Sequence, residues 1–191
     1  MFLRFGYYAP STFANRIQYY FHNVKAGKKH ETKGLLFVRN KGKITIGNNV
    51  RINSSAKANP IGCGTKTYFQ VLPGGELKIG NGSRMSNCAI TVATSVIIGE
   101  NVRIGSGVHI YDTNFHSLDP YKRTAFRENR DDISSKPIEI MDYAFIGAGA
   151  YILKGVKIGK GSIVGAGSVV TKNIPDMEIW GGNPAVKIGR V

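Results

Sequence analysis

The sequence predicts an all-β fold in which short strands stack in successive coils. From residue 140 an aliphatic side chain recurs every six positions, at Ile140, Ile146, Ile152, Ile158, Val164 and Val170. The residue four positions after each is mostly small or β-branched, namely Ala144, Ala150, Val156, Ser162, Ser168 and Ile174. A period of six fits neither the 3.6 of an α-helix nor the 2.0 of an isolated strand. It fits a short strand and a tight corner, repeated.

Glycine supports this prediction, because the chain of 191 residues contains 24 glycines and many follow the repeating aliphatic residue. The pattern reappears at Ile98-Gly99 and Ile104-Gly105, with weaker copies at Ile46-Gly47 and Ile79-Gly80. We expect the glycine to relax the backbone at each turn. A single coil cannot bury its apolar side, so the coils must stack to form a core. We therefore expect a β-helix over residues 41–175.

Three segments depart from the repeat. Residues 1–40 are predicted to be a helical capping segment, and residues 176–191 a cap at the C-terminal end. Residues 111–137 are polar, rich in charge, and interrupt the ladder between two regular stretches. Long loops on a rigid scaffold often carry function, so we expect the active site there.

The N-terminal segment carries Phe13, Ile17, Tyr20, Phe21 and Val24 at helical spacing within residues 11–25. Ser11 or Thr12, which follow Pro10, are candidate caps for its start. We expect the apolar face of this helix to cover the open end of the β-helix, which would otherwise expose strand edges. The alternative is a surface helix that touches membrane or glycan, assisted by basic residues at Arg16, Lys25, Lys28 and Lys29.

The composition of the chain limits the classes of partner that it could bind but does not identify a single class. The net charge of +14 and pI of about 9.9 favour an anionic partner, which could be a phosphate-rich cofactor, an acidic glycan or lipid surface, or nucleic acid. Cys63 and Cys88 form no CxxC pair, which argues against a zinc site and for buried thiols. No apolar run approaches the ~18 residues of a spanning helix. We expect a soluble cytoplasmic protein, with contact at the inner membrane surface left open.

Three stretches of the sequence carry a family resemblance, over roughly residues 75–188. They are IGENVRIGSGVHIYDTNFHSLDP, YAFIGAGAYILKGVKIGKGSIVGAGSVVTKNIP and GGNPAVKI. They resemble the hexapeptide-repeat acyltransferases, in particular the sugar and polysaccharide O-acetyltransferases related to galactoside and maltose acetyltransferases. The resemblance implies a left-handed β-helix, a homotrimer with active sites between subunits, and transfer of an acetyl group from acetyl-CoA to a hydroxyl of a sugar or glycan precursor.

The resemblance also points to the general base. Transfer to a hydroxyl needs a group that takes the proton of the alcohol, and a neutral imidazole suits that task. His116 stands in the polar loop directly after a repeat, where the family keeps its base. A base histidine needs an acceptor on its far nitrogen. Asp112 and Asn114 are the local candidates, and Asp119 is less favoured.

The remaining site residues follow from the family's motifs. Asn87 matches a polar position near the acceptor and could donate to its hydroxyl or to the developing oxyanion. Phe145 stands where relatives often have a tryptophan beside the thioester. The resemblance implies that small residues along the coil edges contact the extended arm of the coenzyme, namely Gly147, Ala148, Gly165 and Ala166. It also places the hydroxyl of Thr171 and the cation of Lys172 near the phosphates of the coenzyme. The sequence departs from the family at Gly189, where relatives often have an arginine, which puts phosphate contact at this end in doubt.

Two other functions are conceivable for a repeat of this kind. A zinc-dependent γ-type carbonic anhydrase needs three converging histidines, and the repeats offer only His109 and His116, so no metal site is expected. A non-catalytic basic scaffold for polyanionic glycan or nucleic acid is the second alternative, although no recognised nucleic-acid module is visible and no nucleic-acid partner is expected. The loop cations Lys122, Arg123, Arg127 and Arg130 hint at an anionic, lipid-linked or nucleotide-linked sugar as the acceptor.

Overall fold

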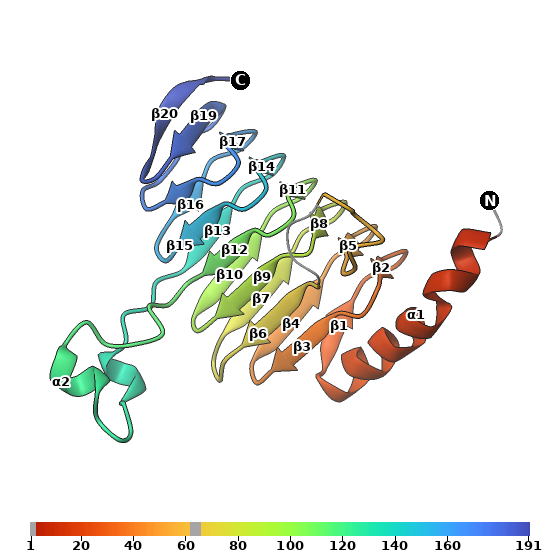
Figure 1. Cartoon of the computed structure of the whole chain (residues 1–191), viewed down its shortest axis with the longest axis horizontal. Coiled ribbons are helices and arrows are strands. Elements are labelled where there is room, and N and C mark those ends of the chain that lie inside the picture. The colour runs from red at the N-terminus through yellow and green to blue at the C-terminus, as the bar shows by residue number, and fades with distance from the viewer. Residues whose placement is uncertain (1–2, 62–65) are drawn as a thin grey trace.

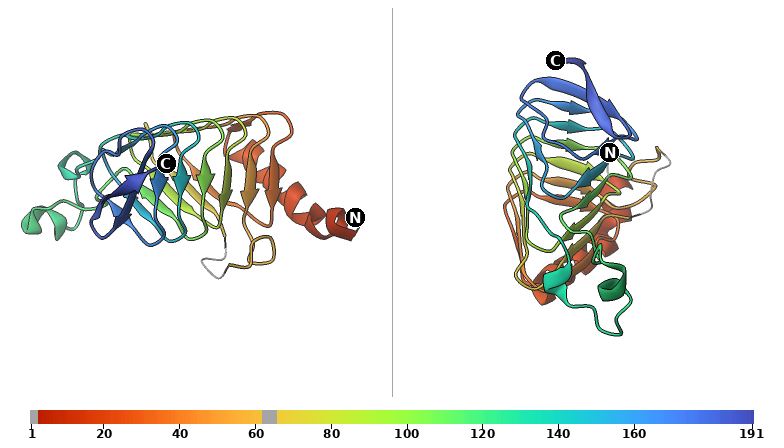
Figure 2. Two further views of the ribbon diagram at one scale, coloured as in Figure 1. Left: turned by 90° about the horizontal axis from the view of Figure 1, so that it is seen from above. Right: turned by 90° about the vertical axis from the view of Figure 1, so that its left-hand side faces the viewer.

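The chain folds as a left-handed parallel β-helix with three faces (Figures 1 and 2). The computed structural model describes residues 3–61 and 66–191, with side chains from residue 8 onward. A helix lies at the N-terminal end of the stack, a loop projects from its side, and a two-stranded hairpin closes the C-terminal end. The predicted fold class is confirmed.

Each face of the β-helix is one sheet of mainly parallel strands, here called A, B and C. Sheet A contains β1 (Val24–Ala26), β4 (Lys43–Ile46), β7 (Glu76–Ile79), β10 (Ser95–Ile98), β13 (Ile138–Ile140) and β16 (Lys157–Ile158). Sheet B contains β2 (Glu31–Lys33), β5 (Arg51–Asn53), β8 (Arg84–Ser86), β11 (Arg103–Ile104), β14 (Phe145–Ile146), β17 (Ile163–Val164), β19 (Glu178–Gly182) and β20 (Ala185–Arg190). Sheet C contains β3 (Phe37–Asn40), β6 (Tyr68–Val71), β9 (Ala89–Val92), β12 (His109–Tyr111), β15 (Tyr151–Leu153) and β18 (Val169–Val170).

The core is the aliphatic ladder that the sequence predicts. Copies of the repeat pair in register, as Ile110 does with Ile90 and Ile152. The ladder residues from 140 to 170 are at most 1% exposed, and the second repeat positions are buried as well. Cys88 belongs to this core, and burial raises the pKa of its thiol to about 12. The expectation of a buried thiol is confirmed for Cys88, whereas Cys63 lies outside the described residues.

The repeat glycines allow the backbones of successive corners to lie close together. We had expected them instead to supply an unusual backbone conformation at each turn. A β-carbon at Gly147 would lie 2.5 Å from the backbone nitrogen of Ala166, so one corner rests directly on the next. The left-handed backbone conformation falls instead on neighbouring positions such as Gly149, Gly167 and Asn101. Glycine is needed where successive corners touch, because any side chain would push the coils apart.

The first coil begins earlier than the sequence predicts. Strand β1 pairs with β4 from Val24 to Ala26, inside the segment 1–40 that we had assigned to a cap. Helix α1 (Leu3–Phe21) is also longer than expected and continues through Pro10. Ser11 and Thr12 therefore lie within the helix, where their hydroxyls donate to the carbonyl oxygen of Tyr8, so their predicted role as caps was wrong.

Helix α1 also faces the opposite way from the prediction. Phe13, Ile17, Tyr20 and Phe21 are 68%, 42%, 82% and 77% exposed. Inward-facing amides cap the first coil instead: Asn15 donates from Nδ2 to Gly34 O and accepts at Oδ1 from Leu36 N. These bonds satisfy the edge of the first coil as another strand would. The hydrogen bonds of that edge, rather than its apolar area, determine how the helix lies.

Two further segments complete the fold. The loop between Tyr111 and Ile138 carries α2 (Pro120–Arg123) and a 3₁₀ turn (Arg130–Asp132), and it projects from the stack as predicted. At the C-terminal end, β19 pairs with β17 and then turns back into the antiparallel strand β20. This hairpin closes the last coil, so residues 176–191 form the expected cap.

Candidate active site

The loop leaves the stack at Asp112, and this carboxylate anchors the coil rather than the histidine. Asp112 is fully buried, and its oxygens accept from the backbone N–H groups of Ala93, Thr94 and Ser95 at 2.6, 2.7 and 2.9 Å, and from Thr94 Oγ1 at 2.9 Å. All of these partners lie on the corner of the preceding coil. Because the carboxylate is committed there, the predicted role of Asp112 in orienting His116 was wrong.

The partner of His116 is Glu128, a residue that the sequence did not point to. His116 Nδ1 lies 2.8 Å from Glu128 Oε2, and Ser117 N donates to the other carboxylate oxygen. A carboxylate can only accept, so Nδ1 carries the proton and Nε2 has a free lone pair. The His116 side chain is 65% exposed, whereas that of Glu128 is 14% exposed. The pair thus presents a basic nitrogen to solvent and holds the ring from behind.

Electrostatics keep Glu128 in the form that this arrangement needs. The Ser117 N–H and, after it, the His116 ring lower the pKa of the Glu128 carboxyl below its ordinary value of 4.5. Glu128 therefore remains a carboxylate at neutral pH. Tautomer control by a carboxylate is the standard requirement for an imidazole base.

The backbone beside His116 is held in an unusual conformation. Phe115 has a positive φ of 64°, which is rare for an aromatic residue, and its ring packs edge-on against Tyr111 at 5.1 Å between centroids. Strained backbone of this kind is found preferentially at functional sites. Asn114 donates its backbone N–H to Ser134 O at the neck of the loop. Its side chain makes no hydrogen bond within the described parts of the chain, so Asn114 does not orient His116 either.

Two of the loop cations are engaged by the loop itself. Lys122 forms an ion pair with Asp132, and the Arg123 guanidinium donates to Ser117 O. Asp119 caps α2 by accepting from Tyr121 N and Lys122 N. Arg127 and Arg130 make no ion pair among the residues that the structure describes, so they remain candidates for an anionic ligand.

The coenzyme residues predicted on small side chains gather at one corner. Gly147, Ala148, Gly165 and Ala166 lie in consecutive coils where sheet B passes into sheet C. Asn87 lies at the same corner, two coils before Gly147. The side chain of Asn87 is buried, with Nδ2 3.4 Å from Ser106 Oγ and with Oδ1 unpaired within the described ranges. This corner is therefore a narrow edge without bulky side chains, next to the buried amide oxygen of Asn87.

Phe145 lies on the outer face of sheet B, next to that corner, and is 46% exposed. In the column it occupies, Arg51, Arg84 and Arg103 precede it in register on successive coils. Arg51 pairs with Glu31, and Arg103 donates to Gly82 O and to neighbouring carbonyls. The face of sheet B that leads to Phe145 is thus strongly positive.

Thr171 and Lys172 lie elsewhere, at the corner where sheet C passes into sheet A. The projecting loop leaves from the same edge two coils earlier, at Asp112. Within one chain, His116 and the Gly147–Ala166 corner therefore occupy opposite edges of sheet C, separated by the ~10 Å length of a three-residue strand. One chain does not bring the predicted site residues together.

His109, the other histidine of the repeats, lies on sheet C. His109 stacks on Tyr151 with ring centroids 4.5 Å apart, and its Nδ1 is buried without a partner in the described chain. Over residues 3–61 and 66–191, no three histidine, cysteine or acidic side chains are grouped so that they could hold a metal ion.

Comparison with known proteins agrees with the repeat and the fold. The pattern of the bacterial transferase hexapeptide (six repeats) matches residues 137–172, and that of the hexapeptide repeat of succinyl-transferase matches residues 86–112. Over these two stretches the chain is thus similar to hexapeptide-repeat transferases. Both matches lie on stacked coils, on either side of the projecting loop.

Individual relatives include a nodulation protein and a putative acetyltransferase. Nodulation protein L of Rhizobium meliloti is 44% identical over 99 residues, which cover 52% of this chain and 51% of that protein. A putative acetyltransferase of Dictyostelium discoideum is 45% identical over 96 residues, covering 50% and 47%. The chain thus spans about half the length of these relatives.

Among solved structures, a hexapeptide-repeat acetyltransferase of Vibrio cholerae in complex with acetyl-coenzyme A is 32% identical, with a TM-score of 0.56 over 64% of each chain. The AntD N-acyltransferase of Bacillus cereus, in complex with dTDP and 3-hydroxybutyryl-CoA, has a TM-score of 0.68 at 23% identity and shares the fold, over 87% of this chain and 82% of that one.

Proposed function

We propose that this protein is a coenzyme A-dependent O-acetyltransferase that moves an acetyl group from acetyl-CoA to a hydroxyl of a sugar or glycan precursor. One observation carries the proposal. His116, on the loop of a hexapeptide-repeat β-helix, has Nδ1 bonded to a carboxylate and Nε2 open to solvent. That is the geometry that a general base for an alcohol requires.

The proposed reaction has two stages at one carbon. The proton of the acceptor hydroxyl passes to His116 Nε2 as the oxygen bonds to the thioester carbonyl carbon. The carbon–sulfur bond then breaks, and the proton held on Nε2 passes to the departing thiolate, so the base is restored. Glu128 remains ionised throughout and stabilises the imidazolium that forms between the stages.

The donor side of the proposal rests on the narrow corner and on the positive charge beside it. The edge at Gly147, Ala148, Gly165 and Ala166 would admit an extended pantetheine arm, because no long side chain stands in its way. Phe145 would wall the thioester. The acetyl-CoA bound by the Vibrio cholerae relative supports this choice of donor.

We infer that the complete site forms between copies of the chain in a homotrimer. His116 and the donor corner lie on opposite edges of sheet C, so a neighbouring subunit is needed to bring one chain's base to another chain's donor edge. Thr171 and Lys172 share the edge of the catalytic loop and would meet phosphates of a coenzyme held mainly by the neighbour.

Substitution of the base tests the chemistry. We expect His116→Ala to lower coenzyme A release in the presence of acceptor by roughly 10²–10⁴-fold, the usual contribution of a general base. Acetyl-CoA at ~100 times its Kd should still stabilise the variant by about 2.7 kcal/mol in thermal unfolding. His22→Ala, directly after the end of α1, is the matched control. Turnover near that of the wild type would refute the base, and a missing thermal shift in the wild type would refute the donor.

Subunit mixing tests where the site forms. Ala166→Trp should block the donor corner while leaving His116 intact, because Ala166 is exposed. Each variant alone should be inactive. Co-expressed His116→Ala and Ala166→Trp chains should recover part of the activity, since some interfaces would then combine an intact base with an intact corner. No recovery from mixed oligomers would place the whole site within one chain.

The column of Arg51, Arg84 and Arg103 favours a second candidate, a scaffold that binds a polyanion. Like charges in register on neighbouring strands repel, so an anion would stabilise this face. The two candidates differ in their response to salt. Polyanion binding falls steeply with salt and does not depend on His116.

A further inference from the structure

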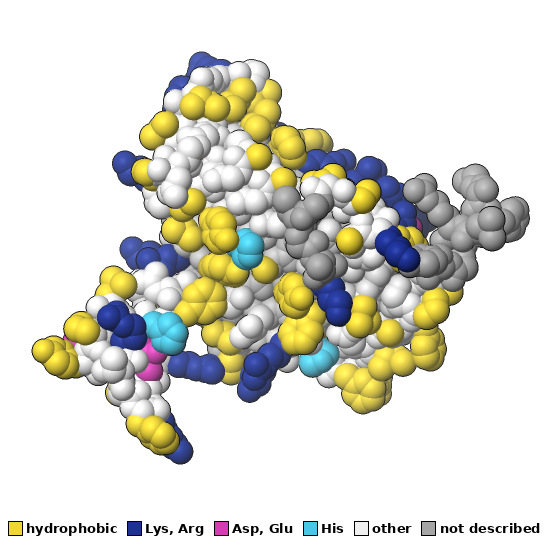
Figure 3. Space-filling model, viewed as in Figure 1, with side chains coloured by type: hydrophobic (Ala, Val, Ile, Leu, Met, Phe, Trp, Pro, Cys, Tyr) yellow, Lys and Arg dark blue, Asp and Glu magenta, His cyan; other side chains and the backbone are white. Residues whose placement is uncertain are grey.

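Helix α1 presents an apolar face to solvent. Phe13, Ile17, Tyr20 and Phe21 all lie on the outer side of the helix. Figure 3 shows apolar side chains gathered along α1 at the N-terminal end of the molecule. The N-terminal half of α1 projects beyond the β-helix (Figures 1 and 2), and the four stripe residues, which lie in the C-terminal half, are all exposed, so no other described element covers this side. A continuous apolar stripe of this kind on an isolated chain indicates an interaction surface.

Specific hydrogen bonds prevent the helix from turning this stripe inward. Besides the two bonds of Asn15, Gln18 Nε2 donates to Leu36 O at 2.9 Å, and Gln18 Oε1 accepts from Val38 N at 3.3 Å. Tyr19, the one buried aromatic residue of the described helix, reaches Thr32 Oγ1 at 3.2 Å. Rotation of the helix would leave the edge of the first coil unsatisfied, which is costly. The outward stripe is therefore built into the way the stack is capped.

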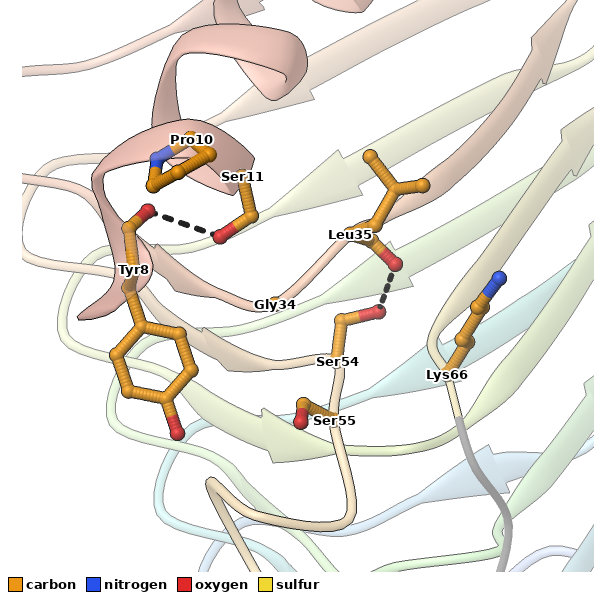
Figure 4. A pocket seen from close by; sticks show the side chains of 8 residues that line it. All are labelled: Tyr8, Pro10, Ser11, Gly34, Leu35, Ser54, Ser55 and Lys66. Carbon is orange, nitrogen blue, oxygen red and sulfur yellow. Dashed lines mark hydrogen bonds between the residues drawn. The ribbon is translucent and has the colours of Figure 1, made fainter.

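The underside of the helix does not offer the same kind of surface. Figure 4 shows the pocket between α1 and the first coils. Ser11 donates to Tyr8 O, and Ser54 donates to Leu35 O and accepts from Thr67 N. The hydroxyls of this pocket are thus used within the fold, whereas the outer stripe has no partner in the described chain.

Charge around the stripe identifies the chemistry of its partner. The first acidic residue of the sequence is Glu31, so residues 1–30 are free of carboxylate side chains. Arg16 lies beside the stripe, and Lys25, Lys28 and Lys29 are exposed on the first coil, which α1 contacts. In the described part of the chain, none of these four cations forms an ion pair. An apolar stripe edged by free cations is complementary to an anionic lipid surface.

We propose that α1 docks this protein on an anionic phospholipid bilayer, with the stripe in the interfacial layer and the cations against the headgroups. Phenylalanine and tyrosine suit that layer, because their rings are apolar and the tyrosine hydroxyl stays hydrated. A second copy fits less well, since a two-fold contact through α1 would bring the same unpaired cations together. No helix among the described residues is long and apolar enough to cross a membrane. The proposal concerns a different surface from the acetyltransferase site and does not depend on that activity.

Vesicle co-sedimentation of the full chain tests this proposal. We expect the protein to pellet with phosphatidylcholine vesicles that contain phosphatidylglycerol, to pellet much less with phosphatidylcholine alone, and to be released by salt. The double variant Phe13→Ser, Phe21→Ser should bind the anionic vesicles roughly tenfold more weakly or worse, because it removes two rings from the interfacial layer.

The matched control removes two equally exposed rings elsewhere. Tyr121 and Phe126 are 86% and 98% exposed on the projecting loop, so Tyr121→Ser, Phe126→Ser should bind vesicles as the wild type does. Both double variants should keep the wild-type unfolding transition. The proposal is overturned if the wild type does not pellet with anionic vesicles, or if the α1 variant pellets equally well. A drop in oligomer mass in the α1 variant, without any vesicle binding by the wild type, would assign the stripe to contacts between copies.

Discussion

The stacked coils and the projecting loop are stabilised by different interactions. In the coils, each strand buries an aliphatic side chain on its copies, and the buried polar side chains are mainly small hydroxyls, such as Ser83 and Ser162, that bond to the backbone at the corners. In the loop, few apolar residues are buried, and the conformation depends on Asp112, Glu128, Asp119 and Asp132, each of which holds backbone or a cation. We therefore expect substitutions on the outer surface of the coils to have small effects, whereas the loop depends on individual carboxylates.

The largest expected effect is a charge inside the ladder. Ile158→Asp should abolish folding, because it buries an unpaired carboxylate between Ile140 and the bridge to Ile174, at a cost that exceeds about 5 kcal/mol. Circular dichroism during thermal unfolding measures this. Lys157→Ala, on the exposed side of the same strand, is the control and should stay folded. An Ile158→Asp protein of wild-type stability would contradict the assignment of the ladder.

The next effect is at the junction of loop and coil. Asp112→Ala should lower the free energy of unfolding by roughly 2–4 kcal/mol, because three backbone N–H groups and a hydroxyl lose their acceptor in a buried place. Asp119→Ala removes an exposed cap on a helix of four residues and should cost about 1 kcal/mol or less. Chemical denaturation of both variants makes the comparison. Equal losses would show that burial of Asp112 carries no special weight.

A smaller effect on stability, but a clear one on activity, is expected at Glu128. Glu128→Gln keeps the shape of the side chain and removes the charge that fixes the tautomer of His116. We expect kcat to fall at least tenfold with little change in KM for acetyl-CoA, because Glu128 acts through His116 and touches no substrate. The pH profile should change with it, which a merely structural role would not produce. An unchanged profile and kcat would separate Glu128 from catalysis.

The smallest effect is that of acid on the loop. The pKa of Glu128 is lower in the folded protein than its ordinary value of 4.5. Its contribution is therefore fully present above pH 4.5 and is lost as the pH falls through the lowered folded value. The protection of the Ser117 amide against hydrogen exchange, relative to its intrinsic rate at each pH, should fall in that range before the protection of the coil amides does. Simultaneous loss of protection in both regions would show that loop and stack unfold together.

The sequence predicted the coils well because a single physical rule generates them. Every sixth residue must be aliphatic if each coil is to bury its inner side on the next, so Ile140 to Val170 could be identified without knowing any contact. The extent of the loop followed from the same rule, since it begins and ends where the ladder stops and resumes.

The details that escaped prediction depend on hydrogen bonds between distant residues. Glu128 reaches His116 only because the loop folds back over twelve positions, and no local spacing encodes that return. The orientation of α1 was predicted from its apolar side chains. In the structure it is determined by the side-chain amides of Asn15 and Gln18, which donate to backbone carbonyls at the edge of the first coil. Asn15 and Gln18, three residues apart, were the available signal. The first coil itself was missed because its strands carry only faint copies of the repeat.

The neck of the loop has a consequence for how such proteins can diversify. The chain leaves the stack at Asp112 and returns at Lys136, whose N–H donates to Asp112 O at 2.9 Å, and Thr113 Oγ1 meets Ser135 Oγ at the same distance just beyond. Departure and return are thus adjacent, and the coils on either side keep their register, as Ile110 does with Ile152. The loop is therefore attached to the coils at a single point, and its length does not affect how the coils stack. Loops of other lengths could be accommodated between Asp112 and Lys136 without disturbing the coils, provided that they keep the pair of His116 and Glu128.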